Sequence, residues 1–259
     1  AWNGSIWVAV GSGGNTIATS PDGITWTGRG ASIFTTTGHE VAWNGSLFVA
    51  VGYGGNTIAT SQDGITWTGR GASVITSRGY AVAWNGSLWV AVGQGGSHTI
   101  ATSLDGITWT GRGNSVITGI GYKVSWNGTI WLACGNQSNI AYSYNGINWL
   151  TTSSTINTNV YSVAWNGNLW IAVGQGATNQ FATSPDGINW TGRGLSGVFN
   201  TNFWDIVWNG NLWVAAGFGS SHGLAYSSDG GISWTGLGLT VGVGNKVSWN
   251  NNIPNVNIQ

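Results

Sequence analysis

The chain has 259 residues, seven of them acidic and seven basic, and only 5% of its residues are charged. So neutral a chain offers no basic face for nucleic acid, and no apolar run approaches the 18 residues of a membrane-spanning helix. The phrase Trp-Asn recurs at intervals of 39 to 43 residues, at Trp2, Trp43, Trp84, Trp126, Trp165, Trp208 and Trp249. This period indicates a tandem repeat.

Taken in chain order, each repeat predicts four short strands. In the third repeat they are residues 79–85 (GYAVAWN), 87–93 (SLWVAVG), 99–103 (TIATS) and 107–112 (ITWTGR). Asn-Gly follows the first strand and Asp-Gly precedes the fourth, and both dipeptides favour hairpin turns in which two residues adopt positive φ. No stretch has apolar residues at a helical spacing. Four-stranded units with this period predict the blades of a β-propeller.

Six such units occupy nearly the whole chain. We therefore expect an all-β fold, a six-bladed β-propeller of four-stranded antiparallel blades, forming one domain over residues 1–259. The first unit lacks its first strand, and residues 245–250 contain a copy of it. We expect this copy to pair with residues 5–11 and close the ring, because closure removes exposed sheet edges. Ala1 and Trp2 would then be displaced, or the tail would begin a seventh, incomplete blade.

Tryptophan is frequent, and 18 of the 19 Trp residues fall at three repeated positions. Seven belong to the Trp-Asn phrase, five lie in the second strand and six in the fourth. We expect them to pack between blades, where each removes roughly 150–250 Å² from water; a sugar-stacking stripe is the alternative. Cys134 stands where other repeats have Val or Ala, so it is predicted to be a core residue. Trp204 alone lies outside the pattern.

The turn before the fourth strand carries a motif. Residues 227–234 read SSDGGISW and match S-x-D-x-G-x-T-W, with Ser233 in place of Thr, and the other repeats carry the shorter S-x-D-G-I-T-W or a variant of it. The repeats resemble those of sialidase-like (BNR, or Asp-box) β-propellers, in which the box is a structural turn. The resemblance implies that side chains bond open backbone groups at Asp22, Asp63, Asp105, Asn145, Asp186 and Asp229. One carboxylate per turn is too few for Ca²⁺, so we expect no metal and no cofactor.

A sialidase, as the resemblance implies, needs three substrate-binding arginines, a Tyr–Glu nucleophile pair and an Asp acid. Five of the acids here are Asp-box residues, and Arg29, Arg70, Arg112 and Arg193 share one repeated position. Glu40 and Asp205 are the only other carboxylates, and no arginine triad or Tyr–Glu pair surrounds them. Glycoside hydrolysis needs two carboxylates about 5–9 Å apart. We therefore expect no catalytic residues and no enzyme activity.

Two kinds of connection meet each face of such blades. The Trp-Asn-Gly and Asp-box turns barely vary, whereas the second-to-third-strand loops and the links between blades differ from repeat to repeat. Loops on a rigid scaffold are where binding residues concentrate, although drift in unconstrained loops would look the same. Four residues before each Trp-Asn phrase stands a mostly aromatic position, followed by most of the remaining charges. The candidate ligand-binding residues are His39, Tyr80, Tyr122, Tyr161, Trp204, Lys123, Asp205, Tyr53, Gln94 and Phe218.

Aromatic side chains beside charges could stack on and hydrogen-bond a sugar; alternatively, these aromatics cap the core between blades. We expect a non-catalytic binding or adhesion module, and the analogy of fold favours a glycan as its partner. The second hypothesis is a structural propeller that contacts proteins in a larger chain or assembly, and the third is a glycoside hydrolase. A sugar bound instead in the groove of the repeated arginines would contradict a glycan site at these aromatics. A chain that opens inside a strand and lacks Met is expected to be part of a longer protein.

Overall fold

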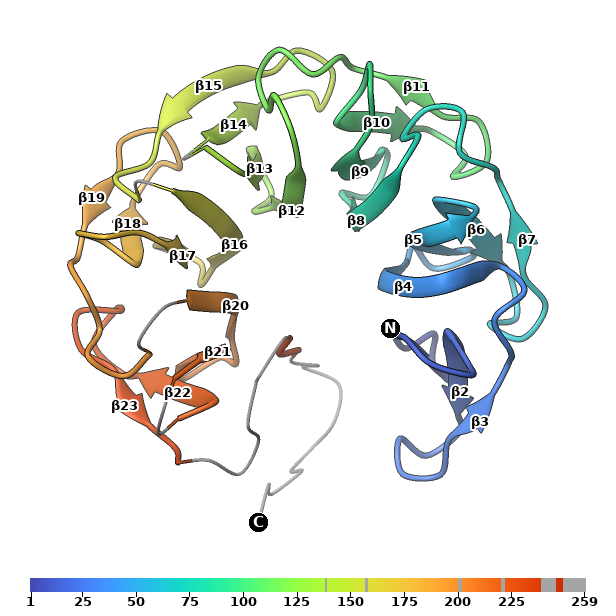
Figure 1. The fold of residues 1–259 in the computed structure, drawn as a ribbon, viewed down its shortest axis with the longest axis horizontal. Helices are drawn as coiled ribbons and strands as arrows, with labels where there is room; N and C mark the ends of the chain where they lie inside the picture. The colour runs from blue at the N-terminus through green and yellow to red at the C-terminus, as the bar shows by residue number, and fades with distance from the viewer. Residues whose placement is uncertain (138, 157, 200–201, 220–221, 239–245, 249–259) are drawn as a thin grey trace. The chain divides into compact units, whose positions relative to one another are not determined.

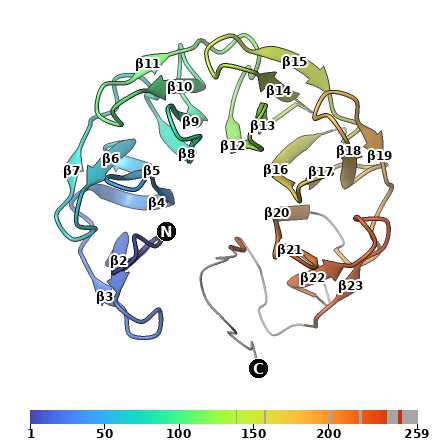
Figure 2. The ribbon, with the colours of Figure 1, turned by 180° about the vertical axis from the view of Figure 1, so that it is seen from behind.

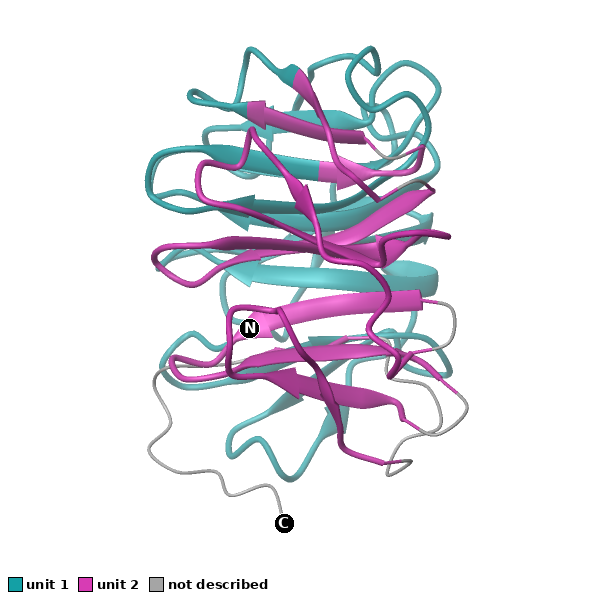
Figure 3. Ribbon diagram, turned by 90° about the vertical axis from the view of Figure 1, so that its left-hand side faces the viewer, with its two compact units in different colours: residues 1–133, 143–150 teal, residues 134–142, 151–259 magenta. Residues whose placement is uncertain are grey.

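A computed structural model describes residues 1–137, 139–156, 158–199, 202–219, 222–238 and 246–248. All regular structure in these residues is β, in 23 strands (Figure 1, and from behind in Figure 2). None of them lies in a helix that could cross a membrane. The chain divides into two compact units (Figure 3), residues 1–133 with 143–150 and residues 134–142 with 151–259. The single domain over residues 1–259 stays a prediction.

Unit 1 contains a three-stranded sheet and an eight-stranded sheet. The three-stranded sheet has the order β1 (Trp7–Val10), β2 (Ile17–Ser20), β3 (Thr27–Gly28). The larger sheet consists of two four-stranded arrays joined by one bridge between Tyr53 and Arg78. The first array is β4 (Phe34–Trp43), β5 (Phe48–Gly55), β6 (Ile58–Ser61) and β7 (Thr68–Gly69). The second is β8 (Arg78–Trp84), β9 (Trp89–Gln94), β10 (Ile100–Ser103) and β11 (Thr110–Gly111).

Three further four-stranded sheets follow in chain order. The first contributes residues to both units and consists of β12 (Gly121–Trp126), β13 (Trp131–Gly135), β14 (Asn139–Ser143) and β15 (Leu150–Ser153). In unit 2 lie β16 (Asn159–Trp165), β17 (Trp170–Gln175), β18 (Phe181–Ser184) and β19 (Thr191–Gly192). The last are β20 (Asn202–Trp208), β21 (Trp213–Phe218), β22 (Leu224–Ser227) and β23 (Thr235–Gly236). Repeated four-stranded sheets of this kind are consistent with a β-propeller.

Neighbouring strands pair antiparallel within the blades, in chain order. In each four-stranded array the turn between the first and second strands and the turn between the third and fourth therefore lie at one end. The second-to-third loop and the link to the next repeat lie at the other, which we call the variable-loop end. The candidate ligand residues belong to the variable-loop end of their own sheets.

The Asn-Gly turns differ from the prediction. Gly86 has φ +101°, but Asn85 is not among the non-Gly residues with positive φ. Its side chain instead organises the turn, because Asn85 Oδ1 accepts the N–H groups of Ser87 at 2.9 Å and Leu88 at 2.7 Å. The turn therefore needs Asn for its side-chain acceptor, and of its two central residues only Gly needs a positive φ.

The fourth strand is shorter than expected. In place of residues 107–112, only Thr110 and Gly111 pair with β10. Asp105 Oδ1 accepts the N–H of Ile107 at 2.8 Å and that of Thr108 at 2.7 Å. A backbone donor that a side chain has taken cannot also join a ladder, so the Asp box delays the start of the strand.

The first sheet has three named strands, as the missing first strand of that repeat predicts. Ala1 and Val8 nevertheless exchange backbone hydrogen bonds of 2.8 Å, and Trp2 bridges Trp7. Ala83–Val90 and Trp84–Trp89 are the equivalent pairs of the third repeat. Ala1 and Trp2 thus occupy the places of the last two residues of a first strand in this repeat and are not displaced. Residues 245, 249 and 250 lie outside the described residues and 246–248 form no strand, so the predicted pairing of residues 245–250 stays untested.

The core prediction is correct for four of the five second-strand tryptophans, whereas Trp7 is only partly buried. Trp89, Trp131, Trp170 and Trp213 have no exposed surface, and Cys134 is equally buried. The tryptophans of the Trp-Asn phrase that the structure describes are half-buried and pack against them, with 5.0 Å between the ring centroids of Trp84 and Trp89. The fourth-strand position is less uniform, because Trp26 is 44% exposed and Trp234 only 8%.

Candidate functional site

A β-bulge interrupts the first strand of four repeats at the candidate aromatic position. In the third repeat Gly79 pairs with Gly93 and Ala81 with Val92, so Tyr80 is the extra residue. His39, Tyr161 and Trp204 hold the same place in the register of their own strands. A bulge bends its strand and re-aims a side chain. The bulge therefore interrupts the regular alternation of side chains along the strand at the aromatic residue.

In unit 1 two of these side chains, His39 and Tyr80, form a row with Tyr122. His39 stacks on Tyr80 with 4.9 Å between ring centroids and 26° between planes, and Tyr80 meets Tyr122 edge to face at 5.6 Å. All three are half-buried. Such pairs contribute about 0.5–1.5 kcal/mol beyond burial, which helps to hold the rings in place.

In unit 2 Tyr161 and Trp204 form the corresponding pair, with 4.6 Å between their ring centroids. The Tyr161 hydroxyl donates to Gln175 Oε1 at 3.1 Å and accepts from Asn159 Nδ2 at 3.2 Å. Burial raises the pKa of Tyr161 above its ordinary value, so the hydroxyl stays neutral and keeps its donor. Gln175 shows that a second-strand residue outside the candidate set also belongs to this site.

The two remaining carboxylates brace neighbouring strands. Glu40 Oε1 lies 2.5 Å from Lys123 Nζ, and Glu40 Oε2 accepts the Val82 N–H at 3.1 Å. In unit 2, Asp205 accepts the Ser162 hydroxyl at 2.6 Å and the Val247 N–H at 3.1 Å. Asp205 is only 4% exposed. Lys123 and Asp205, both predicted ligand residues, therefore have protein partners instead of open surfaces.

The loop candidates share one register position at the end of the second strand. Tyr53, Gln94 and Phe218 pair with Thr37, Arg78 and Asn202 respectively. The Arg78 guanidinium carbon lies 4.4 Å from the centroid of the Tyr53 ring, which is a cation–π contact. Phe218 is 45% exposed and Gln94 is half-buried. Tyr53 thus adjoins the aromatic row of unit 1, and Phe218 presents an uncovered ring in unit 2.

The Asp-box side chains hold their own turns. Ser61 Oγ donates to Asp63 Oδ1 at 2.9 Å, and that oxygen accepts the N–H groups of Ile65 and Thr66 at 2.8 and 2.7 Å. These bonds, the one from Thr66 foremost, lower the pKa of Asp63 to about 2. Asn145 accepts the equivalent bonds at 2.9 Å. Among the described residues, no three His, Cys, Asp or Glu side chains gather as metal ligands would.

Comparison with known proteins supports the fold. No family model and no curated protein matches the chain. Among solved structures it is similar to YCF48 bound to a D1 peptide, with a TM-score of 0.58 and 16% identity over 78% of this chain and 66% of that one. A chain of the Mitotic Checkpoint Complex matches with a TM-score of 0.63 and 16% identity, over 85% of this chain and 70% of its own. An ancestral GH74 enzyme matches with a TM-score of 0.66 and 17% identity, over 91% of this chain but only 37% of its own.

At these identities the likeness shows the β-propeller fold alone. The chain spans about two thirds of the YCF48 chain and little more than a third of the GH74 chain. The neighbours therefore agree with the repeated four-stranded sheets. Membership of the sialidase-like family stays a prediction that rests on the Asp-box residues.

Proposed function

We propose that the chain is a non-catalytic binding module of the Asp-box propeller type, and that it binds glycans at the variable-loop end. The observation that carries this proposal is the bulge that re-aims an aromatic side chain in four first strands. A bulge is a local irregularity that sheets otherwise avoid, and bulges concentrate beside functional sites. Half-buried aromatics with polar edges suit the apolar and hydroxyl faces of a sugar.

The contacts of the carboxylates support a role without catalysis. Glu40 is paired with Lys123, and Asp205 is buried and accepts two hydrogen bonds. A general acid needs a raised pKa and a free approach to its substrate. Carboxylates that brace strands are poorly suited to that task.

We also propose that the six repeats are the six blades of one propeller. The Val247 N–H bonds Asp205 at 3.1 Å, 42 residues away, as the Val82 N–H bonds Glu40. This equivalence supports a tail that takes the same place relative to β20 as β8 takes relative to β4. The tail would then complete the blade of β1, β2 and β3 beside Ala1 and Trp2.

A second candidate function is a module that contacts proteins. Two fold neighbours come from assemblies, YCF48 with a D1 peptide and the Mitotic Checkpoint Complex. In this chain, apolar residues such as Ile24 (84% exposed) and Leu104 (77%) stand uncovered at the Asp-box turns. Exposed apolar surface can mark a protein interface.

A glycan array probed with the purified chain tests the first function. Saturable binding to a defined set of neutral glycans is expected. Turnover of any glycoside on the array would instead favour a hydrolase. Absence of binding to all glycans, together with capture of a peptide at the Asp-box turns, would favour the second candidate.

A further inference from the structure

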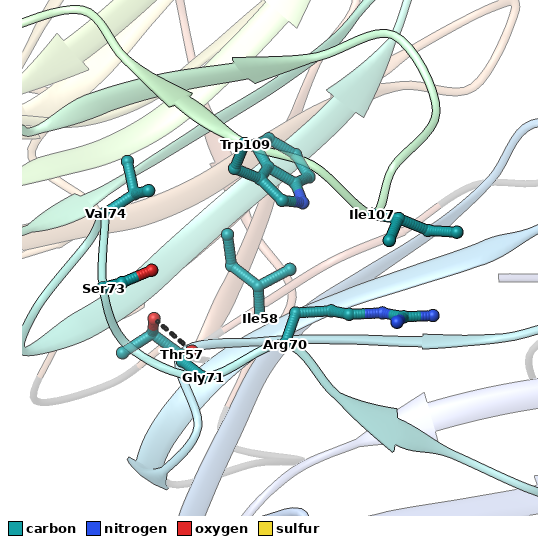
Figure 4. Close-up of a pocket in the computed structure, with 8 residues that line it drawn as sticks. All are labelled: Thr57, Ile58, Arg70, Gly71, Ser73, Val74, Ile107 and Trp109. Carbon is teal, nitrogen blue, oxygen red and sulfur yellow. Dashed lines mark hydrogen bonds between the residues drawn. The ribbon is translucent and has the colours of Figure 1, made fainter.

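A small cleft in unit 1, lined by none of the residues of the aromatic row, lies between one repeat and the Asp-box turn of the next (Figure 4). Arg70, Ile58 and Val74 line it from one repeat, and Ile107 and Trp109 from the following one. Its volume is about 60 Å³. That volume has room for a few water molecules or for a group the size of a carboxylate.

Arg70 brings an oriented guanidinium to this cleft. Its Nε donates to Thr60 Oγ1 at 2.9 Å, and Thr60 is buried. Within the described part of the chain, the two Nη groups of Arg70 have no hydrogen-bond acceptor. A guanidinium whose Nε is held in this way presents its remaining donors at a fixed angle, and carboxylates match that geometry with two parallel bonds.

The following repeat supplies an apolar wall. Asp105 holds the N–H of Ile107, and Trp109 Nε1 donates to Gly106 O at 2.9 Å. The indole donor is therefore occupied, so the side chain offers mainly its apolar surface. Ile107 is 45% exposed. An apolar wall beside an unpaired guanidinium is a site for a ligand with an anionic group attached directly to an apolar body.

The same residues recur in other repeats. Arg29, Arg112 and Arg193 each donate from Nε to the equivalent Thr at 2.8 Å. The repeats that follow them carry the pairs Ile65 and Trp67, Ile147 and Trp149, and Ile232 and Trp234. The fourth repeat has Thr152 in place of the arginine and lacks this donor.

We propose that this cleft and the equivalent positions at Arg29, Arg112 and Arg193, together the arginine clefts, are a repeated set of weak sites for the carboxylates of an acidic polysaccharide. The proposal rests on the proposed glycan function and adds a ligand class for a second surface. In a uronic acid the carboxylate is attached to the sugar ring, so the C–H face of the ring can lie on Ile107 and Trp109 while Arg70 binds the carboxylate. An acidic peptide carries its carboxylate on flexible methylenes and offers no such face. Several weak sites on one polymer raise the overall affinity.

The experiment compares polygalacturonate, neutral dextran, dextran sulfate and polyglutamate of similar length, by calorimetry at low and at 0.15 M salt. The variant is Arg29→Lys with Arg70→Lys, Arg112→Lys and Arg193→Lys, which keeps the net charge but loses the paired donors. We expect about a tenfold or larger loss of polygalacturonate affinity, since charge-assisted bonds are the strong ones. Arg70→Lys alone is the second variant if the fourfold change lowers the melting temperature, and it should produce a smaller loss.

Unchanged polygalacturonate affinity in the fourfold variant would overturn the proposal, because the charge alone would then explain binding. Polyglutamate or dextran sulfate binding as tightly as polygalacturonate would also overturn it. Failure of the glycan function is distinguishable. If neutral glycans never bind at the variable-loop end while the lysine variant still loses polygalacturonate, the arginine clefts stand and the aromatic row is not a glycan site.

Discussion

Lys123 Nζ lies 2.5 Å from Glu40 Oε1, although 83 residues separate the two side chains along the chain. Glu40 sits on β4 and Lys123 on β12, and the other carboxylate oxygen of Glu40 accepts the N–H of Val82 on β8. One carboxylate therefore connects the first strands of three repeats in unit 1.

This arrangement predicts a graded series of variants. Glu40→Ala should lower the free energy of unfolding by about 2 kcal/mol, because it removes the partners of both Lys123 and the buried Val82 N–H. Lys123→Ala should cost less, about 1 kcal/mol, because it removes the partly exposed ion pair but leaves Val82 its acceptor. Glu40→Gln keeps an acceptor for Val82 and should fall between them. Urea unfolding measures the series, and equal costs for both alanine variants would contradict it.

The Asp boxes predict a sensitivity to acid. Bonds from backbone donors and from Ser hold the pKa of Asp22, Asp63, Asp105 and Asp229 at about 2, below the ordinary 3.8. A carboxyl whose pKa is lower in the folded state stabilises the fold above its unfolded pKa. That stabilisation should be complete above about pH 4 and be lost as the pH falls towards 2.

Asp63 isolates one such turn. Asp63→Ala should destabilise the protein by about 1 kcal/mol, as loss of a side-chain cap does, and leave ligand affinity unchanged. Asp63→Asn is the matched control, because Asn145 makes the same bonds in the fourth repeat. The Asn variant should stay close to the parent at pH 7 and lose less stability between pH 4 and 2. A melting temperature unchanged in the Ala variant, with binding lost, would mean that the turn is a ligand site.

Tyr122 and Trp204 test the aromatic rows. Tyr122→Ala and Trp204→Ala should each weaken neutral-glycan binding by about tenfold, the effect of one lost stacking contact of 1–1.5 kcal/mol. The melting temperature of each of these two variants should fall by less than that of Glu40→Ala. The control is Trp26→Ala, because Trp26 is 44% exposed at an Asp-box turn and should not affect binding. Loss of neutral-glycan binding in Trp26→Ala but not in the other two would place the glycan elsewhere.

His98 takes a position that Asn holds in other repeats. His98 Nδ1 accepts the Gly113 N–H at 2.9 Å, as Asn56 Oδ1 accepts the Gly71 N–H at 3.0 Å. His98→Asn should therefore change the melting temperature by less than His98→Ala, which leaves the half-buried Gly113 donor unpaired at a cost of about 1 kcal/mol. Thermal unfolding of both variants at pH 8 gives the comparison, and an Asn variant as unstable as the Ala variant would refute the equivalence.

The tail is tested by two truncations. A protein that ends at Thr240 loses the Val247 N–H that bonds the buried Asp205, whereas one that ends at Asn250 keeps it. We expect the shorter protein to melt at a lower temperature and to self-associate, as proteins with an uncovered sheet edge do. Equal melting temperatures and a monomeric short form by light scattering would remove the main support for six blades.

The strand order and the turn positions could be predicted because they follow from local residues. Trp-Asn-Gly and the Asp box recur at a fixed period, and apolar alternation between them indicates strands. The bulges could not be predicted, because one extra residue changes the register without changing the residue types. Gly79 precedes Tyr80, and a Cβ there would lie 2.6 Å from Thr57 O. Val160 and Phe203 hold the same place in unit 2, so glycine alone is no signal.

The contacts of the candidate site residues could not be predicted. The sequence places Lys123 and Asp205 beside aromatics, yet only the structure shows that each has a protein partner. Side chains distant in sequence set those contacts, and no local pattern reports them. The length of the fourth strand was missed for a related reason, because the Asp-box carboxylate competes with the ladder for the same N–H groups.

That competition also protects the edges of the sheets. The last strand of most repeats is two residues long, as in Thr68–Gly69 and Thr191–Gly192, and the Asp box has already bonded the donors just before it. Natural sheets commonly guard an edge with lysine or other charges, so that another strand cannot add to it. A chain with only 5% charged residues has few to spare, and here one carboxylate in each of five repeats shortens the template on which a foreign strand could align.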